Sequence, residues 1–141
     1  VGAAAKNVIG IAAGMLDGAG YTSLKGALMA RGAREIARLI RAMGGNELSA
    51  YGLCHLGDYQ ATLFSSHSHN RQFGESFIKG EPFDRLAEGA STVQALVRLG
   101  EEYKVDLPIC QTVNDLLYNG LSANEVIPRL FSRSVKGEFD Y

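Results

Sequence analysis

The first seventeen residues constrain the fold of this chain more than any other stretch. Residues 2–17 are almost all small or apolar and contain no proline, yet they are too short and too rich in glycine for a convincing membrane span. This composition predicts a helix that is buried on most sides. One face of that helix carries residues spaced four apart: Gly2, Lys6, Gly10 and Gly14. Since each glycine weakens a helix by about 1 kcal/mol relative to alanine, we expect another helix or a ligand to approach this face closely.

Lys6 is the unusual member of that face. Lysine is almost never fully buried unless it is paired or functional. Desolvation can lower the pKa of such a lysine until it exchanges a proton near neutral pH, as an acid–base catalyst does. The alternative is a helix that begins near Lys6 and lets the ammonium group reach water. The local pattern leaves both interpretations open.

Composition indicates one globular domain without a strong charge bias. The chain has 141 residues and a formal net charge of −1, so it can bury a core but does not resemble a general nucleic-acid binder. Cys54 and Cys110 lie far apart and outside any metal-ligand spacing, as expected of reduced, buried thiols in a cytoplasmic protein. No signal peptide, transit peptide or membrane span is recognisable. The apolar start at Val1 suggests that an upstream part of a longer protein is missing.

Helical periodicity continues along the chain. It predicts a second helix from Leu24 to Arg41 with a solvated face of arginines. Gly44 and Gly45 are expected to end this helix. Further helices are expected at residues 47–56, 93–102, 109–118 and 123–131. A weaker helix is expected from residue 75 to a break at residues 80–82. Ser122 with Glu125 forms a capping-box pattern for the last of these, and residues 132–141 are expected to fray. No segment alternates as a strand does, so residues 1–141 are predicted to form a single all-α domain of six or seven helices.

A long polar segment, residues 57–74, follows neither a helical nor a strand period and is expected to be irregular and functional. It contains His67 and His69, but together with His55 and Asp58 their spacing matches no standard zinc pattern, so no metal site is predicted. The serines beside these histidines lack the strained turn that frames a catalytic serine. A cluster of Ser, His, Asn and Arg side chains suits a phosphate or polyhydroxyl ligand better. No glycine-rich nucleotide loop occurs, so a nucleotide would be held mainly by another part of the protein.

Four motifs occur in a recognisable order, at residues 5–18, 52–58, 68–74 and 87–89. Together they resemble the C-terminal domain of the bacterial-type NAD(P)-dependent glycerol-3-phosphate dehydrogenases, and the similarity covers nearly the whole chain. The resemblance implies an all-helical, 6-phosphogluconate dehydrogenase C-terminal-like substrate domain. In that family it works beside an N-terminal Rossmann domain, absent from this sequence, which would hold NAD or NADP.

The resemblance also implies roles for individual residues. Lys6 would be the catalytic lysine, which gives or takes the proton that accompanies hydride transfer. The substrate would be bound by Lys6, Asn7, Asp58, Ser68, His69 and Asn70, and the cofactor would be reached by His69, Leu86 and Glu88. We expect Lys6, Asn7, Asp58 and Asn70 to line one concave surface.

His69 departs from the family pattern, which usually has arginine at this position. Histidine lacks both the bidentate fork and the permanent charge that arginine offers to a phosphate. The departure affects the expected affinity for a phosphorylated substrate and for the cofactor, although Arg71 nearby could supply a permanent charge.

The function implied is that of an oxidoreductase. The complete cytoplasmic enzyme would interconvert dihydroxyacetone phosphate and sn-glycerol 3-phosphate, a step of carbohydrate metabolism that feeds phospholipid biosynthesis, whereas this part alone would be inactive. Its partners would be the phosphorylated small molecule and the Rossmann domain, with a homodimer left open and neither nucleic acid nor a membrane expected. Two alternatives remain: a related two-domain dehydrogenase for another hydroxy acid or polyol phosphate, and a helical interaction domain without catalysis.

Overall fold

The computed structural model describes residues 2–46, 69–81 and 88–131. Within these ranges the chain forms the α-helices α1 (Gly2–Ala19), α2 (Lys25–Ala42), α4 (His69–Lys79), α5 (Glu88–Tyr103), α6 (Pro108–Tyr118) and α7 (Ala123–Leu130). A short 3₁₀ helix, η1 (Thr22–Leu24), precedes α2. The described part contains no strand, which confirms the predicted all-α class. None of its helices is long and apolar enough to span a bilayer.

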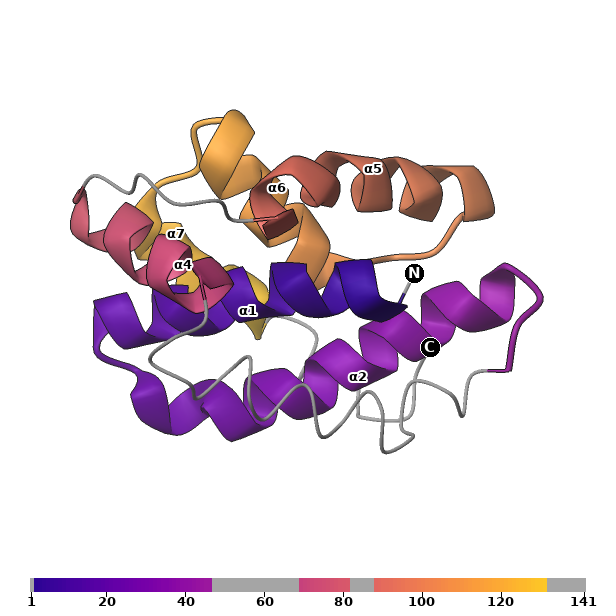
Figure 1. The fold of residues 1–141 in the computed structure, drawn as a ribbon, viewed down its shortest axis with the longest axis horizontal. Helices are drawn as coiled ribbons and strands as arrows, with labels where there is room; N and C mark the ends of the chain where they lie inside the picture. Colours follow the sequence, from indigo (N-terminus) through magenta and orange to yellow (C-terminus); the bar gives the residue numbers. More distant parts are fainter. Residues whose placement is uncertain (1, 47–68, 82–87, 132–141) are drawn as a thin grey trace.

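The core is built around α1. Figure 1 shows this helix running through the middle of the domain, with α2 along one side and α5 and α6 along the other. Every residue from Val8 to Leu16 is buried, which confirms that the helix is covered on most sides. The other helices contribute large apolar side chains to the same core: Leu28, Ile36 and Leu39 from α2, Val93 and Leu96 from α5, Ile109, Val113 and Leu116 from α6, and Val126 and Leu130 from α7.

Glycine allows α1 and α4 to touch backbone to backbone. A Cβ atom added to Gly14 would overlap the carbonyl oxygen of Arg71 and lie 2.8 Å from the amide nitrogen of Glu75. The contact is reciprocal, because a Cβ on Gly74 would overlap the carbonyl oxygen of Ile11. The close approach expected on the glycine face of α1 is therefore made at Gly14 by another helix.

The start of α4 corrects the prediction for residues 57–74. Residues 69–74 are helical rather than irregular. The apolar period is missing because Gly74, and not a large side chain, is the buried residue of α4 where it meets α1. The remainder of that polar segment, the predicted helix at 47–56 and the polar tail lie outside the described residues.

The other predicted boundaries hold with small shifts. After α2, Gly44 has a φ of 87°, and Gly45 N–H donates to the carbonyl of Ile40 at 2.9 Å, as in a glycine C-cap. Helix α5 begins at Glu88, earlier than the predicted residue 93. The N-cap of α7 is Ser122, as predicted, although its hydroxyl accepts from Asn124 N–H rather than from the third residue expected in a capping box.

The arginine face of α2 is less solvated than predicted. Only Arg41 of its four arginines is exposed. The guanidinium of Arg31 lies 5.3 Å from the ring centroid of Phe131, and Arg38 donates to the carbonyl oxygen of Asp106 at 2.9 Å. These side chains join α2 to the segments after α7 and before α6.

A buried carboxylate of α2 completes the N-terminus of α6. Glu35 is 1% exposed, and its two oxygens accept from the backbone N–H groups of Ile109 at 2.7 Å and Cys110 at 3.0 Å. Pro108 precedes them at the first position, where no N–H is needed. Burial raises the pKa of Glu35, and the two backbone N–H groups partly oppose that rise. Cys110 is a free, buried thiol as predicted, and burial together with Glu35 raises its pKa.

An ion network joins α1, α2 and α4 at the other end of α1. Asp17 Oδ2 lies 2.6 Å from Lys25 Nζ and 2.9 Å from Arg71 Nη1, and the same Arg71 nitrogen lies 2.9 Å from Glu75 Oε2. Thr22 donates to the second Asp17 oxygen at 2.8 Å. Burial alone would raise the pKa of Asp17, but the bonds from Lys25, Thr22 and Arg71 outweigh it and hold that pKa below its usual value. The ionised form of Asp17 therefore stabilises the fold.

The glycine contact predicts opposite effects for two Gly→Ala substitutions. Gly14→Ala should lower the free energy of unfolding by about 2–3 kcal/mol, because the methyl group meets the α4 backbone, which cannot move aside as a side chain can. Gly26→Ala is the matched control: Gly26 is an exposed helical glycine with open space around it. It should gain up to about 1 kcal/mol from helix propensity. Urea unfolding measures both values, and equal effects would contradict the close-contact interpretation.

The Asp17 network predicts a dependence of stability on pH. A carboxylate whose pKa is lowered by folding contributes stability above its unfolded pKa, and loses that contribution as pH falls through the folded pKa. We expect the free energy of unfolding to decrease as pH drops below about 4. Asp17→Asn should cost about 3 kcal/mol at pH 7, since it removes the carboxylate that pairs with the buried ammonium group of Lys25, and should respond less to acid. Glu102→Gln, at an exposed position of α5, is the control, and parallel pH profiles for all three proteins would refute the role of Asp17.

Candidate functional site

Five of the residues expected at the site fall in the described part of the chain. Lys6 and Asn7 lie near the start of α1, His69 and Asn70 are the first two residues of α4, and Glu88 is the first residue of α5. The other expected residues, Asp58, Ser68 and Leu86, lie outside the described residues.

Lys6 and Asn7 occupy the end of α1 that leads into its fully buried stretch. Both side chains are half-buried, and neither is without a partner. The position of Lys6 lies between the two alternatives that the sequence left open, because its side chain is neither enclosed like Val8 nor fully exposed to water. A half-buried ammonium group can reach a ligand and still be held in place by its surroundings.

Three helices meet beside Asn7. Asn70 Oδ1 accepts a hydrogen bond from the backbone N–H of Gly89 at 3.0 Å, which ties the first turn of α4 to the first turn of α5. Gly89 in turn lies so close to α1 that an added Cβ would be 2.7 Å from the carbonyl oxygen of Asn7. The structure therefore brings Asn7, Asn70 and Gly89 together from three separate helices.

This meeting point also gathers the sequence neighbours of those residues. Lys6 precedes Asn7, His69 precedes Asn70 and Glu88 precedes Gly89. His69 is exposed at the first position of α4. Ammonium, imidazole and carboxamide groups, the polar groups of Lys6, His69 and Asn70, are of the kinds that can donate hydrogen bonds to an oxygen-rich anion.

Arg71 directs its positive charge away from this meeting point. Its side chain is 12% exposed and its Nη1 atom is bonded to both Asp17 and Glu75. Asp17 is eleven residues after Lys6 on α1, which corresponds to roughly 16 Å along the helix axis. Two carboxylates therefore already balance the charge that the sequence offered as a substitute for arginine at position 69.

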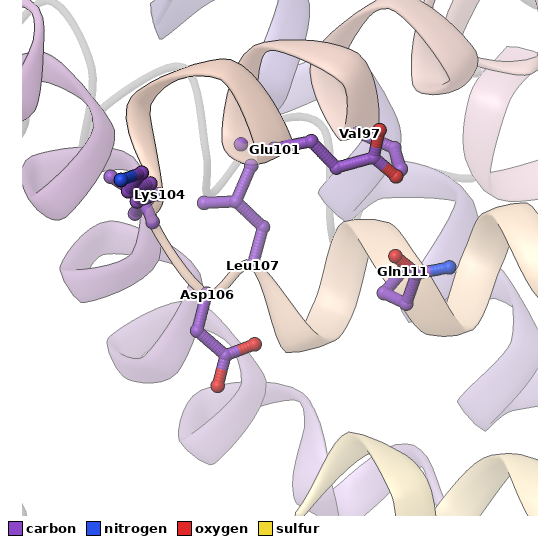
Figure 2. Close-up of a pocket in the computed structure, with 8 residues that line it drawn as sticks. Val97, Glu101, Lys104, Asp106, Leu107 and Gln111 are labelled. Carbon is purple, nitrogen blue, oxygen red and sulfur yellow. The ribbon is translucent and has the colours of Figure 1, made fainter.

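A hollow of about 280 Å³ lies elsewhere on the described surface. It is formed by the last turns of α5, the following turn and the start of α6. Figure 2 shows its labelled lining residues: Val97, Glu101, Lys104, Asp106, Leu107 and Gln111. It sits at the C-terminal end of α5, whereas Gly89 and the expected site are at the N-terminal end, roughly 20 Å away along that helix. Among the described residues no group of three or more His, Cys, Asp and Glu could hold a metal ion.

Two polar contacts of the described residues had no clear signal in the sequence. The Asn70–Gly89 hydrogen bond joins residues 19 apart, and no local pattern identifies its partners. Burial of the Asp17 carboxylate among Lys25 and Arg71 is likewise a tertiary feature. Gly89, the last residue of the motif at residues 87–89, is where α5 packs closely against α1.

Comparisons with known proteins agree with this architecture. Residues 1–128 match the family described as the NAD-dependent glycerol-3-phosphate dehydrogenase C-terminus. The chain is 40% identical over 144 residues to a glycerol-3-phosphate dehydrogenase [NAD(P)+] of Thermus thermophilus, covering 98% of this chain and 45% of that protein. It is 37% identical to glycerol-3-phosphate dehydrogenase [NAD(P)+] 1 of Salinibacter ruber, covering 98% of this chain and 43% of that one.

A solved structure shares the fold as well. The crystal structure of glycerol-3-phosphate dehydrogenase from Coxiella burnetii superposes with a TM-score of 0.82 at 28% identity, over 92% of this chain and 42% of the crystallised one. The chain thus spans less than half the length of each of these relatives. By its sequence match and its fold, this chain belongs to the family of NAD-dependent glycerol-3-phosphate dehydrogenase C-terminal domains.

Proposed function

We propose that this chain is the substrate-binding, catalytic-lysine domain of an enzyme that interconverts dihydroxyacetone phosphate and sn-glycerol 3-phosphate. The observation that carries the proposal is the meeting of α1, α4 and α5 at Asn7, Asn70 and Gly89. Lys6, His69 and Glu88 each precede one of these three residues in the sequence, and the relatives of this chain are named for this activity.

The chemistry requires two reagents on the substrate carbonyl. A reduced nicotinamide supplies a hydride when it is bound, and Lys6 supplies the proton to the carbonyl oxygen. Asn7 holds the hydroxyl end of the substrate beside Lys6, assisted by Asp58. Ser68, His69 and Asn70 bind its phosphate, with His69 as the only one of the three that can be cationic.

The cofactor is proposed to be held mainly by an N-terminal Rossmann domain of the same protein. The sequence of this chain has no glycine-rich loop that could cradle a dinucleotide pyrophosphate. What this chain adds are His69, Leu86 and Glu88 on the side of the substrate that faces the cofactor. A cytoplasmic location belongs to the same proposal, and a homodimer is compatible with it.

The full-length protein provides the direct test. We expect NADH- or NADPH-dependent reduction of dihydroxyacetone phosphate, and no turnover by this domain alone. A panel of other ketones, including unphosphorylated dihydroxyacetone and 2-oxo acids, separates this activity from that of a related dehydrogenase. A higher kcat/KM for any of these ketones would overturn the assignment of the substrate.

Substitution of Lys6 tests the proton donor. Lys6→Ala in the full-length protein should lower kcat by on the order of 10²-fold or more, with a smaller effect on KM. Lys6→Arg should not rescue kcat, because arginine keeps the charge but does not release its proton. Lys79→Ala, at the exposed end of α4, is the matched control. If Lys6→Arg restores wild-type kcat, the lysine contributes charge and not a proton.

Substitution of His69 tests the phosphate contact. Arginine is always charged, whereas histidine is charged only in part of the physiological pH range. His69→Arg should therefore lower KM for dihydroxyacetone phosphate, and His69→Ala should raise it. Because the substrate phosphate itself titrates near pH ~6, the three proteins are compared with one another at each pH. Identical KM values for all three would show that His69 does not bind the phosphate.

A further inference from the structure

Asn70 connects two helices of the proposed site through a single hydrogen bond. We propose that Asn70 is a positioning residue: its carboxamide oxygen locks the first turn of α5 against α1, and so sets the spacing between the Lys6 side and the Glu88 side of the site. The inference rests on the proposed function and adds to it a role for Asn70 that is separate from binding the substrate.

The first step concerns the N-terminus of α5. Gly89 is the second residue of this helix, so its backbone N–H is one of the first four amides that have no acceptor within the helix. Asn70 Oδ1 accepts from that N–H at 3.0 Å. A side chain of α4 therefore acts as a cap for α5.

The second step concerns the lack of free space at Gly89. This residue is buried, and a Cβ there would come within 2.7 Å of the Asn7 carbonyl oxygen and 2.8 Å of Ile11 Cδ1. The first turn of α5 thus packs against α1 at Asn7 and Ile11. With Asn70 holding Gly89 on one side and α1 blocking it on the other, the start of α5 cannot shift without breaking one of the two contacts.

The third step concerns the other end of the carboxamide. Because the Gly89 N–H is a donor, the Asn70 atom that faces it must be the oxygen, which fixes the orientation of the amide. The Asn70 nitrogen then points away from Gly89, and its side chain is only half-buried. Toward a ligand Asn70 can therefore offer only N–H donors, which suit a phosphate or hydroxyl oxygen.

Substitutions in the full-length protein can separate the role of the carboxamide oxygen of Asn70 from that of its nitrogen. Asn70→Asp keeps an oxygen for the Gly89 N–H but replaces the nitrogen donors with a second, negatively charged oxygen. Asn70→Ala removes both ends. Gln94→Ala, at an exposed position of α5, controls for a general effect on that helix.

The first readout is amide hydrogen exchange at Gly89, followed by NMR. We expect wild type, Asn70→Asp and Gln94→Ala to exchange at similar rates, and Asn70→Ala to exchange roughly tenfold faster, the factor that corresponds to losing a hydrogen bond worth about 1.4 kcal/mol. Equal rates in wild type and Asn70→Ala, or equally fast rates in Asn70→Ala and Asn70→Asp, would overturn the proposal.

The second readout compares the change in KM for dihydroxyacetone phosphate with the change in KM for the nicotinamide cofactor. Asn70→Ala should raise KM for both dihydroxyacetone phosphate and the nicotinamide cofactor by about tenfold. Asn70→Asp should restore the cofactor KM to within about threefold of wild type while the substrate KM stays high, because a carboxylate repels the phosphate. If the cofactor KM does not change in Asn70→Ala, the contact between Asn70 and Gly89 is only structural and the positioning role is refuted. Absence of any activity toward dihydroxyacetone phosphate in wild type would instead refute the proposed function, while the exchange rates would still test the cap.

Discussion

The backbone contact between α1 and α4 is the constraint on which the rest of the domain depends. At Gly14 and Gly74 neither helix has a side chain between itself and its neighbour, so their backbones come as close as two helices can. That proximity places the first turn of α4 beside the middle of α1, and from there Asn70 reaches Gly89. A methyl group at either glycine would separate the two helices and move one wall of the proposed site away from the other.

Buried polar side chains fix how the remaining helices are arranged around α1. Glu35 of α2 completes the N-terminus of α6, Asn70 of α4 completes that of α5, and Asp17 of α1 holds Lys25 of α2 and Arg71 of α4. Each of these contacts joins two different helices and satisfies groups that would otherwise be buried at a cost. Apolar packing alone allows helices to slide along one another, whereas a hydrogen bond to one particular N–H group sets their register.

The same arrangement keeps one group of structural charges together. Asp17, Lys25, Arg71 and Glu75 balance one another at the end of α1 that is distant from Lys6. Lys6 and His69, the two basic residues of the proposed site, take part in none of these ion pairs and precede Asn7 and Asn70 in the sequence.

Sequence alone determined the all-α class, the burial of α1, most helix boundaries and the family. The class, the burial and the boundaries follow from local periodicity and from the positions of glycine and proline. The family follows from motifs that are each a short, contiguous stretch of the chain. It also identified Gly14 as a point of close approach and Lys6 as the exceptional residue of α1. Only the tertiary structure decided that residues 69–74 are helical, because their buried position is a glycine that leaves no apolar period. It also decided that Arg71 belongs to the Asp17 network and that Asn70 caps α5, because both contacts join helices that are distant in sequence, and a donor does not reveal its acceptor until the chain is folded.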